Sequence, residues 1–154
     1  MPYREDARDD VLILAGHAQS DGYSRERGPV SVRAVDVISG ETQWETSLGL
    51  GDVLAMNVGK HIVAVATRAP NEVAIDLQCL NKETGSSLWT THIQGRGFLS
   101  HHIGILIERN QVILSRARDV ICFGSGGEQL WTQQVFKPHV GTTAETYSPD
   151  RKTR

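Results

Sequence analysis

Residues 32–44 read VRAVDVISGETQW, and the ending of this stretch, a glycine followed four positions later by a tryptophan, occurs three times in the chain. The three motifs are Gly40 with Trp44, Gly85 with Trp89, and Gly127 with Trp131. The tryptophans recur after 45 and 42 residues (89 − 44 and 131 − 89). A nearly constant period of this length is typical of repeat architectures, in which each repeat is one structural unit that buries its apolar face against the next.

The residues around each motif follow the pattern of a β-hairpin. After Gly40, Trp44 shares one face with Thr46 and Leu48, and this alternation is typical of a half-buried strand. Strand-like runs also precede the glycines, at residues 30–37, 73–80 and 119–123. Each glycine then lies in a short turn between two strands, where a residue that readily adopts a positive φ is favoured.

A second hairpin precedes the first in two of the three repeats. Residues 53–58 and 61–67 flank one tight turn, and residues 105–109 and 112–115 flank another. Only one such strand, at residues 11–15, is visible in the first repeat. The fold class is therefore predicted to be all-β, with about eleven strands in three four-stranded antiparallel sheets, the first of them incomplete.

The chain divides into three segments by composition. A charged segment at residues 1–10 precedes the repeat domain, which is predicted to span residues 11–136, and a polar tail follows at residues 137–154. The hydrophobic content of 39% and the charged content of 22% are ordinary for a folded soluble domain. The net charge of −2 lacks the basic field that nucleic-acid binding needs, so no nucleic-acid partner is expected.

Membrane association is not expected either. No apolar run is long enough to cross a bilayer, and residues 1–10 lack the apolar stretch of a signal peptide. We therefore expect a cytoplasmic location if Met1 is the native start. The three arginines Arg109, Arg116 and Arg118 are expected to be solvated surface residues.

The two cysteines, Cys79 and Cys122, are too few for a disulfide framework. They precede the repeat glycines by six and five residues (85 − 79 and 127 − 122). Equivalent strands should therefore point them to opposite faces of their sheets, because side chains alternate along a strand. Two separate buried thiols are expected.

A strand that ends in Asp-x-x-x-Gly and is followed by this tryptophan resembles the repeat of quinoprotein-type (pyrroloquinoline-quinone-like) β-propellers. Asp36 begins the pattern in the first copy, Asn81 replaces the aspartate in the second, and Phe123 stands there in the third. We expect Asp36 and Asn81 to bond the turn backbone. The resemblance covers residues 11–135 and implies that each repeat is one blade, with the tryptophan packed between adjacent blades.

The predicted fold is thus a partial β-propeller of about three blades, fewer than the four to eight with which propellers usually close. An open arc exposes a sheet face at each end. Three arrangements would cover these faces: two copies form a six-bladed ring, another chain supplies the missing blades, or the sequence is a piece of a longer protein.

The resemblance also brings quinoprotein dehydrogenases into consideration, and it implies that such enzymes hold a quinone and calcium within a large closed ring, beside a disulfide between adjacent cysteines. This chain has no adjacent cysteines, no carboxylate cluster for calcium and no Gly-x-Ser-x-Gly hydrolase motif. We expect no enzymatic activity, no cofactor and no metal site. The adjacent His101 and His102 would point to opposite sides of a strand, so they are not expected to share a metal.

The function that fits these observations is a non-catalytic scaffold for protein interaction or a part of a larger propeller assembly, completed by a protein partner or by self-association. The link between the second and third strands of a repeat varies in length, and insertions at one such point often form a binding face. Its long form, at residues 19–29, contains Tyr23, Arg25 and Arg27, which we expect to contact a partner. The alternative is a sensor of a small molecule or ion in the channel of an assembled ring.

Overall fold

The computed structural model describes residues 10–17, 28–95, 103–116 and 119–134. Within these ranges the chain forms strands and turns only, which confirms the predicted all-β class. No helix long and apolar enough to cross a membrane occurs among these residues. The strands are β1 (Val11–His17), β2 (Val30–Asp36), β3 (Thr42–Gly49), β4 (Asp52–Val58), β5 (Ile62–Arg68), β6 (Ile75–Asn81), β7 (Ser87–Ile93), β8 (Gly104–Glu108), β9 (Gln111–Ser115), β10 (Asp119–Phe123) and β11 (Gln129–Gln134).

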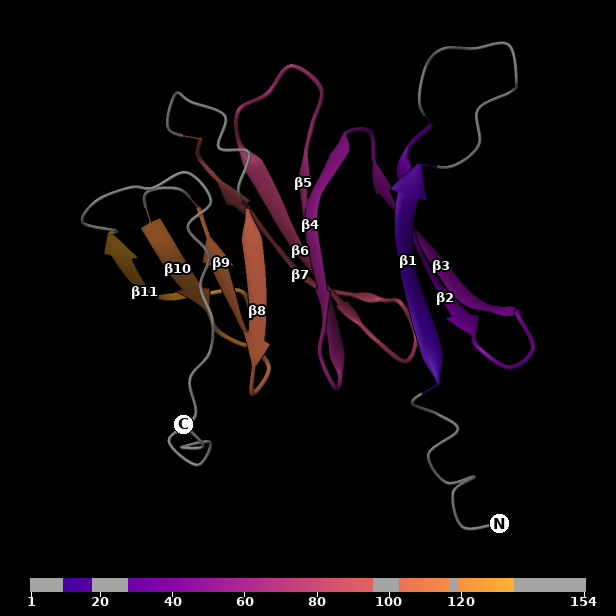
Figure 1. Ribbon diagram of the computed structural model, residues 1–154. Helices are drawn as coiled ribbons and strands as arrows, with labels where there is room; N and C mark the ends of the chain where they lie inside the picture. The colour runs from indigo at the N-terminus through magenta and orange to yellow at the C-terminus, as the bar shows by residue number, and fades with distance from the viewer. Residues whose placement is uncertain (1–9, 18–27, 96–102, 117–118, 135–154) are drawn as a thin grey trace, which may run out of the picture.

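These strands form three separate antiparallel sheets that stand in a row (Figure 1). Their orders are β1-β2-β3, β4-β5-β6-β7 and β11-β10-β9-β8, so strands that follow one another in sequence are always neighbours. Neighbouring sheets approach each other through β1, β4 and β8, which therefore lie on the inner side of the arc. This arrangement is that of three consecutive propeller blades, the first with three strands and the others with four.

The strand that the first blade lacks, within the described residues, is the innermost one. Leu12 on β1 pairs with Val35 on β2, in the same way that Val63 on β5 pairs with Leu80 on β6. Strand β1 therefore corresponds to β5, the second strand of the next blade. The prediction that the first blade is incomplete at its first strand is confirmed.

Two apolar cores hold the blades together, one at each contact between sheets. The core between the first and second blades contains Ile13, Val32, Ala34, Trp44, Val63, Val65 and Leu80. The core between the second and third blades contains Ala64, Ala66, Leu77, Cys79, Trp89, Val112, Leu114, Ile121 and Phe123 among its buried residues. The middle blade is covered on both faces, which is why β5 is buried without interruption from Ile62 to Thr67.

The hairpin turns differ in length, and this difference corrects two sequence predictions. The amide of Gly40 donates to the carbonyl of Asp36, and that of Gly85 donates to Asn81, each four residues earlier. The amide of Gly127 donates to Gly124, only three residues earlier. The third turn is thus one residue shorter, so Gly124, and not Phe123, occupies the place of the aspartate.

The shorter turn also places the cysteines on equivalent faces. Cys79 pairs with Trp89 across one hairpin, and Cys122 pairs with Trp131 across the other. Residues directly opposite each other in a sheet share a face. The prediction that the cysteines point to opposite faces is therefore wrong, because the count back from the glycine includes the shortened turn. Both thiols are free and buried, as expected.

Candidate functional site

Each buried tryptophan lies against the turn glycine of the following blade. A Cβ atom built on Gly85 would lie 2.5 Å from Cδ2 of Trp44, and one built on Gly127 would lie 2.9 Å from Cδ2 of Trp89. Real side chains do not tolerate such short separations, so only glycine leaves room for the indole ring. The glycines and tryptophans selected from the sequence therefore belong to one contact that the structure repeats.

Hydrogen bonds fix the tryptophan in this position. Nε1 of Trp44 donates to the carbonyl of Lys82 at 2.8 Å, and the hydroxyl of Thr46 donates to the carbonyl of Gly85 at 2.6 Å. In the next contact the hydroxyl of Thr91 donates to the carbonyl of Gly127 at 3.0 Å. We call this arrangement the tryptophan–glycine joint. In it, the indole ring lies over the turn glycine of the next blade, and the threonine two residues after the tryptophan donates to the carbonyl of that glycine.

The two halves of this joint are left open at the two ends of the arc. The exposed fraction of Trp131 is 44%, against 9% for Trp44 and 8% for Trp89. A Cβ atom built on Gly40 would meet no described atom within 4 Å. The expectation that the tryptophans pack between blades is thus correct for two of them, whereas Trp131 lies on the uncovered face of the last described blade.

One face of the first blade, which no other described blade covers, is apolar along β1. The exposed fractions of Leu12 and Leu14 are 50% and 46%. The equivalent residues of the second blade, Val63 and Val65, are fully buried in the core that contains Trp44. The two leucines therefore occupy positions that form a blade-to-blade core wherever a preceding blade is present.

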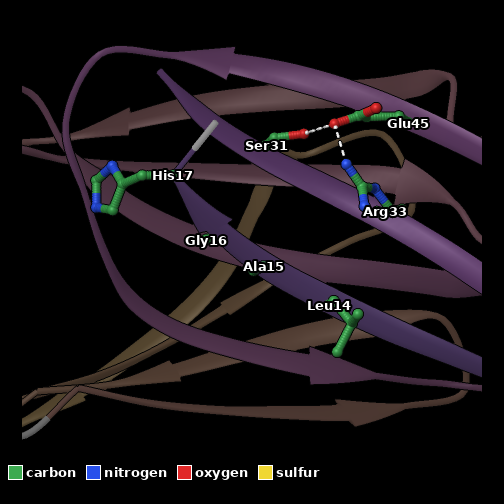
Figure 2. A pocket seen from close by; sticks show the side chains of 7 residues that line it. All are labelled: Leu14, Ala15, Gly16, His17, Ser31, Arg33 and Glu45. Atoms are coloured by element: carbon green, nitrogen blue, oxygen red, sulfur yellow. Dashed lines mark hydrogen bonds and ion pairs between the residues drawn. The ribbon is translucent and has the colours of Figure 1, made fainter. Parts of the chain in front are cut away.

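The same face carries a shallow hollow of about 450 Å³, shown in Figure 2. We call this surface the N-terminal end face; it comprises Leu12, Leu14, Ser31, Arg33 and Glu45. Oε1 of Glu45 accepts hydrogen bonds from Ser31 Oγ at 2.8 Å and from Arg33 Nη2 at 3.2 Å. The Ser31 hydroxyl and then the Arg33 guanidinium lower the pKa of Glu45. The charges at the rim of the hollow are thus already paired with each other.

Residues 29–135 match the model of a PQQ-type repeat family that is described as outer membrane protein assembly factor BamB. The chain belongs to this family. The match includes all three of the tryptophan–glycine motifs, and it confirms the resemblance found in the sequence.

No curated protein matches the PQQ-type chain. Among solved structures, it is similar to a protein of unknown function from Bacteroides caccae, with 13% sequence identity and a TM-score of 0.48. The match covers 79% of this chain and 40% of that protein, so the chain spans well under half of that protein's length.

The described part of this PQQ-type chain offers no constellation for metal or thiol chemistry. No group of three or more His, Cys, Asp or Glu side chains within it is placed to hold a metal ion. Burial raises the pKa of Cys79 to about 11 and also raises that of Cys122. Both thiols are therefore protonated and poorly nucleophilic at neutral pH.

Several predicted positions lie outside the described residues. These are His101, His102, Arg118, the loop with Tyr23, Arg25 and Arg27, residues 1–9 of the charged segment and the polar tail at residues 137–154. The hypothesis that this loop contacts a partner stays a prediction.

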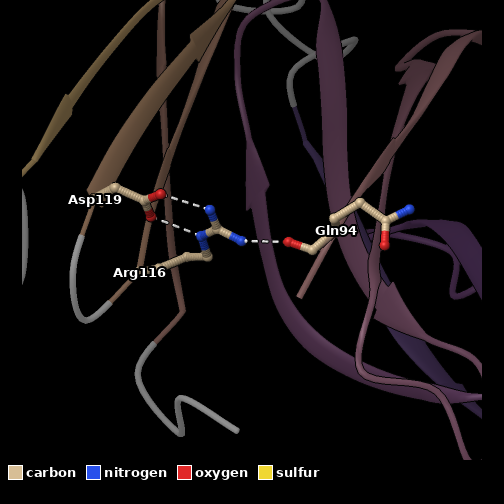
Figure 3. A network of polar contacts seen from close by, with 3 residues as sticks. All are labelled: Gln94, Arg116 and Asp119. Carbon is tan, nitrogen blue, oxygen red and sulfur yellow. Dashed lines mark hydrogen bonds and ion pairs between the residues drawn. The ribbon is translucent and has the colours of Figure 1, made fainter. Parts of the chain in front are cut away.

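A largely buried ion pair, whose burial the sequence did not indicate, fastens the third blade to the second (Figure 3). Arg116 donates to both carboxylate oxygens of Asp119, at 2.7 Å from Nε and 2.5 Å from Nη2, and its Nη1 donates to the carbonyl of Gln94 at 3.0 Å. The exposed fractions of the two side chains are 11% and 5%. The expectation that Arg116 is a solvated surface residue is wrong, because its guanidinium pairs with Asp119 and bonds the carbonyl of Gln94, just after β7, and little of its side chain is exposed.

Proposed function

We propose that this PQQ-type repeat chain is a non-catalytic module of a larger propeller assembly, in which it serves as a scaffold for protein interaction. The observation that supports this proposal is the uneven exposure of equivalent residues. Trp131 is exposed, whereas the equivalent Trp44 and Trp89 are buried. Leu12 and Leu14 are likewise exposed, whereas their counterparts in the next blade are buried. Both ends of the arc thus present surfaces of the kind that the chain itself uses to join blades.

Covering these faces is energetically favourable. Burying a leucine side chain completely stabilises a protein by about 1.5–3 kcal/mol, so covering the exposed half of each leucine would contribute about half of that free energy. Trp131 has a larger apolar surface to cover, and the indole N–H of the equivalent Trp44 donates to the carbonyl of Lys82 in the joint between the first two blades. Contiguous apolar surface with a paired polar rim is typical of interaction sites on soluble proteins.

Sedimentation velocity over a wide range of protein concentrations tests the proposal. We expect the parent chain to associate and the variant Leu14→Glu to associate much less, because a carboxylate would have to be buried in the contact. The matched control is Leu88→Glu, since Leu88 on β7 has a similar exposed fraction of 48% but lies in the middle blade, away from both end faces. A parent chain that sediments as one copy at every concentration, as both variants do, would overturn the proposal.

A further inference from the structure

We propose that the partner on both end faces is a second copy of this chain, joined head to tail so that Trp131 of each copy lies over Gly40 of the other. This inference rests on the proposed function, because it names the occupant of the surfaces described there. One chain carries both open halves of the tryptophan–glycine joint, and they lie at opposite ends of the arc. Three blades from each copy give a ring of six, within the range of four to eight in which propellers close.

The open turn of the first blade already has the conformation of a turn that receives a tryptophan. Oδ1 of Asp36 accepts hydrogen bonds from the amides of Ile38 and Ser39 at 2.8 and 3.0 Å. Oδ1 of Asn81 accepts the corresponding bonds from the amides of its turn at 2.8 and 3.1 Å. The φ angles of Gly40 and Gly85 are 75° and 77°. Because the acceptor half is preformed, a new joint does not have to order it.

The donor half at the other end is held in register in the same way. Trp131 pairs across its hairpin with Cys122, as Trp89 pairs with Cys79. The position of the bonding threonine, two residues after the tryptophan, is taken by Gln133, whose longer side chain also carries a donor. In the joint between copies we therefore expect Gln133 to donate to the carbonyl of Gly40.

The acceptor for the indole N–H follows from the same correspondence. Trp44 donates to the carbonyl of Lys82, three residues before Gly85. The residue three positions before Gly40 is Val37, whose side chain is exposed. Nε1 of Trp131 is thus assigned to the carbonyl of Val37 in the second copy. Leu12 and Leu14 of that copy should join Trp131 in one apolar core, as Val63 and Val65 share a core with Trp44.

The donor and acceptor halves are tested by one variant each. Trp131→Ala removes the indole, and Gly40→Ala adds a methyl group where the indole has to lie. The control for the glycine is Gly49→Ala, because Gly49 also has a positive φ, of 89°, and open space around a built Cβ, so it carries the same backbone strain outside the joint. The control for the tryptophan is Leu130→Ala, on the opposite face of β11.

We expect the parent and both controls to sediment as two copies, and each of the two test variants to sediment mainly as one. An equimolar mixture of Trp131→Ala and Gly40→Ala should then regain association, because the intact Trp131 of one variant finds the intact Gly40 of the other. Acrylamide quenching supplies a second readout. The emission of Trp131, measured as the difference between the parent and Trp131→Ala, should become protected from the quencher as the parent associates. Should Gly40→Ala fail to fold, Leu14→Glu replaces it as the acceptor variant in the mixture.

The outcomes separate this inference from the proposed function. Association that depends on the end faces but is not restored in the mixture overturns the head-to-tail joint and leaves the proposed function standing. Growth beyond two copies overturns the closed ring, since a head-to-tail contact that does not close produces filaments. A parent chain that remains a single copy at all concentrations overturns both.

Discussion

Tryptophan contributes differently to the stability of this chain at different positions, depending on whether a neighbouring blade covers it. Trp89 lies in the core between two blades, where its ring centroid is 6.0 Å from that of Phe123. Trp131 has the same place in its own hairpin but is exposed on its outer face. The stability of a single copy should therefore depend on Trp89 and hardly on Trp131.

Urea unfolding of dilute single copies measures this contrast. We expect Trp89→Ala to lower the free energy of unfolding by about 3–5 kcal/mol, the range for truncation of a large buried aromatic side chain. Trp131→Ala should lower it by less than about 1 kcal/mol, as for most substitutions at exposed sites. Equal losses for the two variants would contradict the assignment of Trp131 to an uncovered face.

Asp36 gives the first blade a dependence on pH. The backbone amides of Ser39 and Ile38 lower the pKa of Asp36 below its usual value of 3.8. Because the folded pKa lies below the unfolded one, the stabilisation is fully present above the unfolded pKa and is lost as the pH falls through the folded pKa. Asp36→Asn keeps the acceptor and removes the titration, since Asn81 makes the same bonds in the second blade.

Paired unfolding curves of the parent and Asp36→Asn test this effect at neutral and at acid pH. The parent should lose stability relative to the variant as the pH falls below about 4, while the other carboxyl groups contribute equally to both proteins. A difference between the two proteins that stays constant over this range would show that the carboxylate does not bond the turn.

At the scale of elements, the ion pair of Arg116 and Asp119 links the residue after β9 to the first residue of β10, and the arginine also bonds the carbonyl of Gln94, the residue after β7. Removing one partner of a buried pair leaves the other charge uncompensated, whereas removing both does not. We expect Arg116→Ala to lower the free energy of unfolding by about 3–5 kcal/mol. Arg116→Ala combined with Asp119→Ala should lower it by less than the two single changes added together. Additive losses in this double-mutant cycle would mean that the pair is not coupled.

Sequence periodicity predicted the elements well because each hairpin repeats the same physical pattern. The alternation after Gly40 gave the buried face of β3, and the position of Asp36 gave its bonds to the turn. The third repeat was harder to align, because its turn is one residue shorter and no residue type marks the deletion. This difference of one residue in turn length explains why the sequence predicted the wrong sheet face for Cys122 and the wrong equivalent position for Phe123.

The partners of Arg116 could not be read from the sequence either. Asp119 lies three residues away, which suggests a local pair, but its burial depends on the end of β7 in another blade. Contacts between blades are set by how sheets stack, and this information is distributed over the whole repeat.

For the whole molecule, the repeat motifs predicted the three blades and their order, and the match to the PQQ-type family agrees with them. The sequence implied an exposed sheet face at each end of the arc but not which residues lie on it, because a repeat at the end has the same signature as one in the middle. Gly40 and Trp131 are distinguished from Gly85 and Trp89 only by the structure, in which each lacks a described neighbour. The sequence therefore identified the residues of the candidate interface, but it did not show that they lie on an exposed surface.

The short first blade has a consequence for any ring that two copies build. In each copy the inner side of the arc is formed by β4 and β8, whereas the first blade presents β1, a strand that corresponds to the second position of its neighbours. Among the described residues no strand pairs with the inner edge of β1, so the wall of the central channel of such a ring would have two opposite recesses, each bordered by this edge. Its cross-section would thus have twofold rather than sixfold symmetry, and an extended peptide could pair with β1 in each recess as a further strand of the first blade.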